Sequence, residues 1–149
     1  MKASIMAPAV ALALGVATAT AMAFEGPGAH FIESWDLNGD GVVTVAEARD
    51  RRSDVFASFD ANEDGFLDEK EYVLFDEARE LDQAENEPQG RGRGNQNPAN
   101  GMRLEVNDTN GDGKVSETEF LDNAAPWIEM IDRNGDGVVT RADFGPGRK

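Results

Sequence analysis

Cysteine is absent from this sequence of 149 residues, and histidine occurs once, at His30. Without cysteine the chain has no disulfide, no thiolate metal site and no lipid-modified cysteine. A single histidine and a single tyrosine, Tyr72, leave few side chains for nucleophilic or acid-base catalysis. We therefore expect no catalytic residues, no organic cofactor and no enzymatic activity, and we expect His30 to cap or decorate a helix.

Basic residues are also scarce, because 14 Lys and Arg face 29 Asp and Glu, which gives a formal net charge of -15. Such a charge repels nucleic acid and anionic lipid and attracts cations. A disordered acidic chain would carry its carboxylates in runs, whereas here they recur at fixed offsets from glycines. Arg91 and Arg93 lie among glycines, but two arginines are too few to indicate an RNA-binding tract. No nucleic-acid partner is expected.

The first 23 residues have the pattern of an export signal. Lys2 precedes an apolar run to about Gly15, and Ala21-Met22-Ala23 has the small-x-small pattern of a cleavage site. An uncleaved membrane anchor is the alternative, because the apolar stretch nearly reaches the ~20 residues that a span needs. Ala and Thr dominate the stretch and favour cleavage, so we expect a mature chain from Phe24 that is periplasmic or secreted and leaves the membrane.

Four segments of twelve residues repeat one pattern, and we number them loops 1 to 4. They are residues 36–47, 60–71, 108–119 and 132–143. The first three match D-x-[DN]-x-[DN]-G-x5-E in full, and the fourth ends in Asp143 instead of glutamate. One isolated copy would be compatible with a metal-free turn rich in Asp and Asn, but four copies with matched flanks argue against that interpretation.

Each loop position meets a need of a hard cation, which takes about six to eight oxygen ligands. In loop 1, Asp36, Asn38 and Asp40 supply short side-chain oxygens at positions 1, 3 and 5. Position 7 contributes only its backbone carbonyl, and position 12 closes the shell with both oxygens of a longer carboxylate. Position 6 bends sharply with a positive φ and is glycine in every loop: Gly41, Gly65, Gly113 and Gly137.

Apolar residues flank the loops at matched offsets and predict a shared core. Position 8 is apolar throughout, as expected if paired loops join through a short β-bridge: Val43, Leu67, Val115 and Val139. Three loops are preceded by one apolar face of an entering helix: Phe31, Ile32 and Trp35; Val55, Phe56 and Phe59; Trp127, Ile128 and Ile131. Loop 3 follows only Met102, Leu104 and Val106, so its entering helix should be short.

This pattern resembles the EF-hand superfamily, and most closely its compact bacterial exported calcium-binding members. The resemblance covers the mature chain apart from residues 85–101, and its signature is among the more specific short motifs. It implies calcium coordination, with up to four Ca2+ ions, by the following residues: Asp36, Asn38, Asp40, Val42, Thr44 and Glu47; Asp60, Asn62, Asp64, Phe66, Asp68 and Glu71; Asp108, Asn110, Asp112, Lys114, Ser116 and Glu119; Asp132, Asn134, Asp136, Val138, Thr140 and Asp143.

The spacing of the loops predicts how they pair. Loop starts lie 24 residues apart within each half, which leaves 12 residues between loops and barely room for two helices. We therefore predict one helix over residues 45–59, with loop 1 pairing with loop 4 and loop 2 with loop 3. A helix break at Ser53, with Ser53 as the cap, would instead restore pairing of neighbouring loops. In the second half, Pro126 predicts a kink, with Asn123 as a possible cap.

The predicted fold is all-α, with four EF-hand motifs in two compact loop-helix-loop units and short β-bridges between paired loops. The expected organisation is a signal peptide over residues 1–23, an EF-hand pair over 24–84, a flexible Gly/Pro/Asn/Arg linker over 85–101 and a second pair over 102–149. A domain this small without disulfides would depend on bound metal for its stability.

The four sites should differ in affinity, which follows ligand charge. Loop 2 has four ligand carboxylates and should be tight, whereas loop 4 ends in the shorter Asp143, contains Arg133 and should be weak or selective for Mg2+. The expected function is calcium binding outside the cytoplasm, as a buffer or a calcium-stabilised module. A calcium sensor with a protein partner and a lanthanide binder remain alternatives. Lanthanide-binding relatives carry Pro at loop position 2, where this chain has Leu37, Ala61, Thr109 and Arg133.

Overall fold

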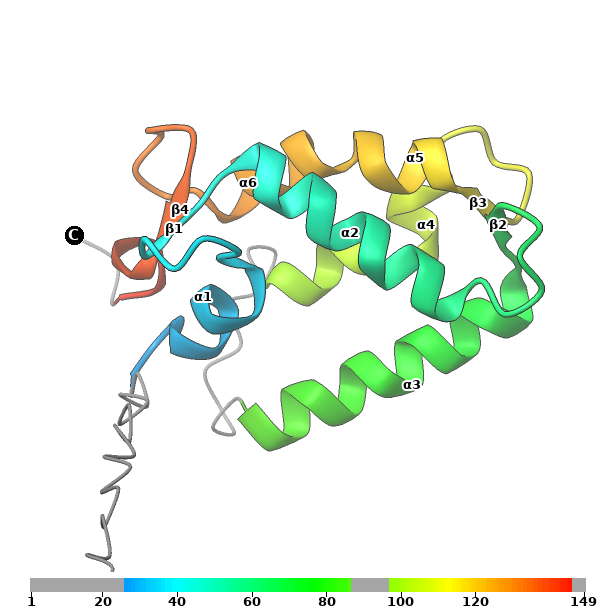
Figure 1. Ribbon diagram of the computed structural model, residues 1–149, viewed down its shortest axis with the longest axis horizontal. Coiled ribbons are helices and arrows are strands. Elements are labelled where there is room, and N and C mark those ends of the chain that lie inside the picture. The colour runs from blue at the N-terminus through cyan, green and yellow to red at the C-terminus, as the bar shows by residue number, and fades with distance from the viewer. Residues whose placement is uncertain (1–25, 87–96, 146–149) are drawn as a thin grey trace, which may run out of the picture.

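The structure is a computed structural model that describes residues 26–86 and 97–145. The predicted signal peptide and the middle of the predicted linker lie outside these residues. The described chain is mostly helical, with two pairs of two-residue strands, which confirms the predicted helical class with short β-bridges (Figure 1). Its elements are α1 Ala29–Trp35, β1 Val42–Val43, α2 Val45–Phe59, β2 Phe66–Leu67, α3 Glu69–Asn86, the 3-10 helix η2 Pro98–Met102, α4 Leu104–Asn107, β3 Val115–Ser116, α5 Glu117–Asp122, α6 Ala124–Ile131, β4 Val139–Thr140 and the 3-10 helix η3 Arg141–Phe144.

Helix α2 is continuous and spans the whole interval between loops 1 and 2. It is capped by Thr44, whose side chain accepts a hydrogen bond from the Glu47 N–H, and it contains neither glycine nor proline. It ends where the Asp60 N–H donates to the Phe56 carbonyl at 2.9 Å. The predicted single helix over residues 45–59 is confirmed, and the alternative break at Ser53 is wrong.

The corresponding interval of the second half is interrupted, as Pro126 predicted. Helix α5 ends at Asp122 and α6 begins at Ala124. Helix α5 ends four residues before Pro126 because the proline ring would clash with the carbonyl of Asp122 in a continuous helix. The Asn123 side chain makes no capping bond to α6 and instead donates to the Val106 carbonyl at 3.0 Å.

The strand pairs join loops that are far apart in the sequence. Strand β1 pairs antiparallel with β4, and β2 pairs antiparallel with β3. Helix α2 packs along α5 and α6, and the two strand pairs lie at opposite ends of this layer (Figure 1). Loop 1 therefore pairs with loop 4 and loop 2 with loop 3, which confirms the pairing predicted from the spacing.

A single apolar core receives side chains from both halves of the chain. The four residues at loop position 8, Val43, Leu67, Val115 and Val139, are fully buried. The flanking aromatics also lie in or against this core, as predicted, with the Trp35 and Trp127 ring centroids 4.4 Å apart. Among the described residues, no helix is both long enough and apolar enough to cross a bilayer.

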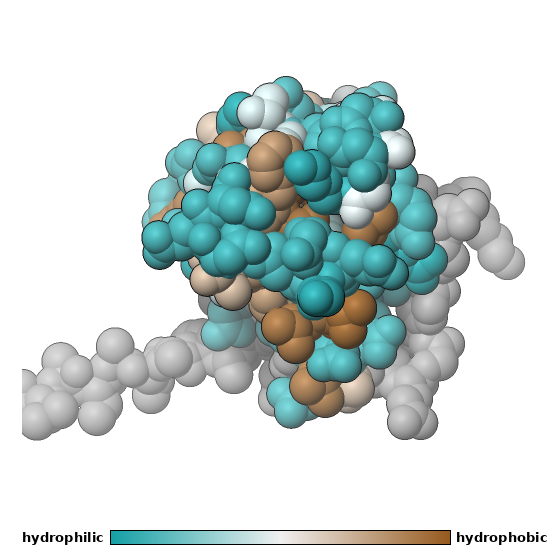
Figure 2. All heavy atoms as spheres, turned by 90° about the vertical axis from the view of Figure 1, so that its right-hand side faces the viewer, coloured by the Kyte–Doolittle hydropathy of each residue, from teal (hydrophilic) through white to brown (hydrophobic). Residues whose placement is uncertain are grey.

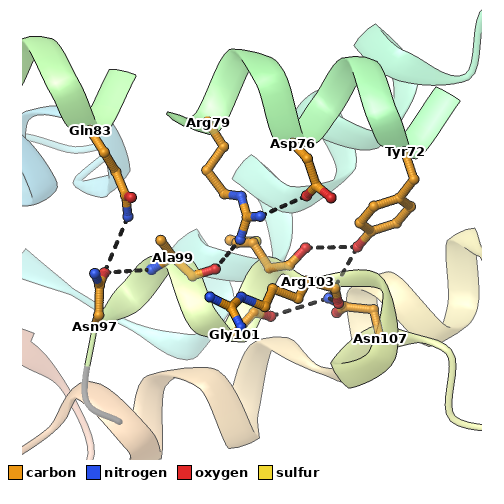
Figure 3. Close-up of polar contacts among 10 residues, drawn as sticks. Tyr72, Asp76, Arg79, Gln83, Asn97, Ala99, Gly101, Arg103 and Asn107 are labelled. Carbon is orange, nitrogen blue, oxygen red and sulfur yellow. Dashed lines mark hydrogen bonds and ion pairs between the residues drawn. The ribbon is translucent and has the colours of Figure 1, made fainter. Parts of the chain in front are cut away.

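Helix α3 contacts α1 and η2 through polar side chains. Nε2 of His30 in α1 lies 3.0 Å from both carboxylate oxygens of Asp82, in agreement with a role on the helix surface. Arg79 donates to the Ala99 carbonyl, and Gln83 donates to the Asn97 side chain at 3.3 Å (Figure 3). These contacts hold the start of η2 against α3.

The boundaries of the predicted linker need correction at both ends. Residues 85 and 86 complete α3, and residues 98–101 belong to η2. Gly101 is buried against Trp127, whose indole N–H donates to the Pro98 carbonyl at 2.8 Å. Composition indicated a flexible tether over residues 85–101, but packing against Trp127 orders the last residues of this segment. The short helix predicted before loop 3 is confirmed as the four-residue α4.

Candidate metal centres

The short side chains of loop 1 are held by backbone N–H groups of the same loop. The carboxylate of Asp36 accepts from Gly39 N at 2.7 Å through Oδ1 and from Gly41 N at 2.7 Å through Oδ2. Asn38 Oδ1 accepts from Asp40 N at 2.8 Å, and Asp40 Oδ1 accepts from Val42 N at 2.9 Å. Asp36 Oδ2, Asn38 Oδ1 and Asp40 Oδ1 each accept one of these bonds and keep a further lone pair for a cation. The loop is thus wound around the residues at positions 1, 3 and 5.

The other three loops repeat this winding. Their first carboxylate accepts from the glycine N–H at position 6 at 2.7 to 2.9 Å, in the pairs Asp60 and Gly65, Asp108 and Gly113, and Asp132 and Gly137. The φ angles at position 6 range from 80° to 87°, so the predicted need for glycine there is confirmed. Position 4 also has a positive φ in every loop, a feature that the sequence analysis missed. In loop 2 this position is Glu63, with φ 56°.

Positions 9 and 12 of the loops form helix capping boxes. Thr44 with Glu47, Ser116 with Glu119, and Thr140 with Asp143 each bond reciprocally, side chain to backbone in both directions. In loop 2, Asp68 accepts from Glu71 N at 3.0 Å while Glu71 accepts from Asp68 N at 3.0 Å. The capping pattern S/T-x-x-E in loops 1 and 3 was visible in the sequence and would have predicted this role for position 9.

The position 12 carboxylate also reaches back across the start of its loop. Glu71 Oε1 accepts from Ala61 N at 3.0 Å, which brings the last residue of loop 2 to the second. Carboxylate oxygens of Asp60, Asp64 and Glu71 consequently lie within 4.8 Å of one another. Loop 2 was predicted to be the tightest site, and this convergence favours that prediction.

Loop 4 closes in the same way despite its shorter final residue. Asp143 is fully buried, and its oxygens accept from Arg133 N at 2.9 Å and Thr140 N at 2.8 Å. The following turn is the 3-10 helix η3, which is narrower than an α-helix and accommodates the shorter side chain. The guanidinium of Arg133 points away from the loop carboxylates and donates to the Gly145 carbonyl at 2.8 Å.

The side chains at position 7 of loops 2 and 3 contact each other. Lys114 Nζ lies 3.8 Å from the centroid of the Phe66 ring, so a cation-π contact joins loop 3 to loop 2. Val42 and Phe66 are strand residues whose Cα partners are Thr140 and Ser116. This arrangement agrees with a ligand role for the backbone of position 7 and leaves its side chain free to vary.

Loop hydrogen bonds favour the charged form of several carboxylates. The Ser116 N–H lowers the pKa of Glu119. Burial acts to raise the pKa of Glu47 and of Asp132, but several hydrogen bonds together outweigh it, among them those from Thr44 to Glu47 and from Gly137 to Asp132, and both pKa values are lowered. These three carboxylates therefore present ionised oxygen ligands at neutral pH, which suits a hard divalent cation rather than a soft metal.

Comparison with known families agrees with this donor set. The EF hand family model matches residues 53–75, 105–122 and 124–145, which contain loops 2, 3 and 4. Loop 1 lies outside the matched segments, although its hydrogen bonds repeat those of the other loops. No curated protein matches the chain significantly. The three matches, on loops with an all-oxygen donor set, support placing the chain in the EF-hand superfamily and indicate calcium binding.

Proposed function

We propose that the protein binds calcium ions in all four loops outside the cytoplasm, as a buffer or as a module that calcium stabilises. The convergence of Asp60, Asp64 and Glu71, whose carboxylate oxygens lie within 4.8 Å of one another, carries the proposal. Negative charges so close repel one another, and a divalent cation relieves that repulsion. The same winding in loops 1, 3 and 4 supports three further sites, the fourth being weak or selective for Mg2+.

Burial of the two methionines in the described chain favours a stabilised module over a sensor. Sensors of this kind use flexible, methionine-rich surfaces to bind partners. Here Met102 is only 4% exposed and Met130 packs partly buried against the core. The position 8 residues of all four loops meet in that same core, so an ion that orders a loop also orders the packing.

Calorimetric titration of the chelator-treated protein with Ca2+ tests the proposal, with Mg2+ and La3+ in parallel and helix content followed by far-UV circular dichroism. We expect three or four Ca2+ ions to bind, with helix gained on loading. Binding of fewer than two ions would contradict the four-site proposal. La3+ ordering the chain where millimolar Ca2+ does not would favour the lanthanide alternative.

Single substitutions at position 12 assign each binding event to a loop. Glu71→Gln keeps the shape of the side chain but removes a charged ligand, so it should abolish one tight site. Glu77→Gln is the matched control, because Glu77 is an exposed residue of the same helix α3 outside the loops. An equal loss of sites in both variants would mean that general charge, and not loop 2, holds the ion.

Export requires a separate test, because residues 1–23 lie outside the described chain. The proposal rests on the signal pattern that ends at Ala21-Met22-Ala23. Intact mass and amino-terminal sequencing of the protein recovered outside the cytoplasm should give a chain that begins at Phe24. Recovery of the intact chain in the cytoplasm alone would contradict export without affecting the metal sites.

A further inference from the structure

The side chain of Arg52, in the middle of α2, is fully buried and bonds to both ends of loop 3. Its Nε donates to the Phe120 carbonyl at 2.7 Å, and its Nη2 donates to Asn107 Oδ1. Asn107 immediately precedes Asp108, the first residue of loop 3, and Phe120 immediately follows Glu119, the last. One guanidinium therefore bridges the two points at which the chain enters and leaves this loop.

The entering end is also held by its own network. The Asn107 amide donates to the Tyr72 hydroxyl at 3.2 Å and to the Arg103 carbonyl at 2.8 Å. Tyr72 in turn donates to the Met102 carbonyl at 2.8 Å (Figure 3). Helices α3 and α4 thus fix the orientation of the Asn107 side chain, so that its oxygen is presented to Arg52.

The exit end is held by stacking as well as by hydrogen bonding. The Arg52 guanidinium carbon lies 4.5 Å from the centroid of the Phe120 ring and 5.2 Å from that of Trp127. The donor directions of a planar guanidinium are fixed, so a shift of one end of loop 3 relative to the other would break one of the two hydrogen bonds of Arg52. The distance between the two ends of loop 3 is therefore set from outside the loop, by a residue of α2.

Burial of the Arg52 charge costs free energy, which indicates that its hydrogen bonds to Asn107 and Phe120 have a specific role. Burial lowers the pKa of Arg52 to about 10, so the group is still charged at neutral pH. Among the described residues no carboxylate forms an ion pair with it, and Nη1 has no hydrogen-bond partner. An uncharged side chain of similar length would fill the same space without the cost of burying a charge. Only arginine supplies a pair of donor nitrogens that bond to Asn107 and to Phe120 at the same time.

We propose that Arg52 is a positioning residue for the metal site of loop 3, and that it holds Asp108 and Glu119 at the separation the ion requires. The inference rests on the proposed calcium binding. It also ties loop 3 to α2, whose two ends carry Glu47 of loop 1 and Asp60 of loop 2. Calcium in loops 1 and 2 orders the two ends of α2, and the hydrogen bonds of Arg52 connect this ordered helix to loop 3.

Nuclear magnetic resonance titration separates the four loops. The position 6 glycine amides, Gly41, Gly65, Gly113 and Gly137, each donate to the first carboxylate of their own loop and report its occupancy. Calcium is added to the purified protein and to Arg52→Met. We expect the Gly113 midpoint to rise about tenfold or more, as for other residues that orient metal ligands, with a much smaller change at Gly137.

Two further variants isolate the role of this pair of donor nitrogens. Arg51→Met is the matched control, because Arg51 is the neighbouring, half-exposed arginine of α2 and lies in a long ion pair, 3.9 Å, with Asp54. It should leave all four midpoints unchanged. Arg52→Lys keeps the charge but lacks the two separate nitrogens with which Arg52 reaches Asn107 and Phe120, so we expect an intermediate shift at Gly113. This variant also provides the test if Arg52→Met fails to fold in saturating calcium.

The outcomes distinguish the inference from the function on which it rests. If no glycine amide of the unaltered protein responds to calcium, the proposed function fails and the role of Arg52 fails with it. If the unaltered protein binds calcium but both Arg52 variants leave Gly113 unchanged, only the positioning role is overturned. Equal shifts at all four glycines would assign Arg52 a purely structural role and would overturn it too.

Discussion

Val43 of β1 lies opposite Val139 of β4 in an antiparallel pair, and both side chains are fully buried. The two residues come from opposite ends of the described chain, one in loop 1 and the other in loop 4. Each loop therefore supplies part of the apolar surface that the other needs. Loops 1 and 4 should consequently form and bind metal as one unit.

Truncation of this pair should destabilise the protein. Val43→Ala or Val139→Ala removes buried methyl groups and should lower the free energy of unfolding by about 1–3 kcal/mol. Because the residues are in contact, the double variant should cost measurably more or less than the sum of the two. Urea unfolding in saturating calcium measures the free energy of unfolding of the two single variants and the double variant. Val73→Ala, at a site 52% exposed, is the control, and its free energy of unfolding should change little.

Gly101 should not tolerate a side chain. A Cβ atom at this position would lie 2.1 Å from Cδ1 of Trp127, which the core holds in place. Gly101→Ala should therefore lower stability by about 1–3 kcal/mol through overpacking, and it should change tryptophan fluorescence. Gly145→Ala is a suitable control, since the nearest atom would lie 3.9 Å away. Equal stability of the two variants would show that η2 does not pack against Trp127.

Glu63 occupies a backbone conformation that favours glycine. Its φ is 56°, whereas loops 1, 3 and 4 have glycine at this position. Left-handed backbone costs a residue with a Cβ about 1–2 kcal/mol, although glycine also makes the unfolded chain more flexible. Glu63→Gly should raise stability by up to about 1 kcal/mol in calcium. Glu77→Gly, in the interior of α3, should instead lower it by about 1 kcal/mol.

Acid should destabilise the chelator-treated protein in a defined pH range. The pKa values of Glu47 and Glu119 are lowered from the ordinary 4.5, so the folded state binds fewer protons than the unfolded state in that range. The resulting stabilisation is complete above about pH 4.5 and is lost as the pH falls through the folded pKa values. Urea unfolding midpoints between pH 3 and 7, roughly the carboxylate range, measure the effect. Glu119→Gln should flatten the profile, and an unchanged slope would contradict this origin.

Local features of this chain could be predicted from the sequence because local contacts produce them. The carboxylate of Asp36 bonds to N–H groups three to five residues ahead, and the positive φ of Gly41 belongs to the same turn. The identities of positions 1 to 12 therefore determine the loop wherever it lies. The capping boxes, such as Thr44 with Glu47, are equally local and were missed only because position 9 was considered as a metal ligand alone.

The burial of Arg52 could not be predicted from the sequence. It follows Arg51 in a charged stretch of α2, and nothing in its type distinguishes a fully buried guanidinium from a half-exposed one. Asn107 likewise resembles an ordinary residue before a loop. Their roles depend on α2, α3 and α4 meeting around them, which is a property of the packed molecule.

The sequence by itself determined the four loops, their donor atoms and the spacing that allows loop 1 to meet loop 4, because these depend on neighbours within one or two turns of chain. It left open whether Ser53 breaks α2, and its composition placed the linker bounds too far out at both ends. Only the tertiary structure decided those points, together with the burial of Arg52 and Gly101. The reason is that burial is set by side chains such as Trp127 and Phe120, which are distant in sequence and reach these residues only when the helices pack.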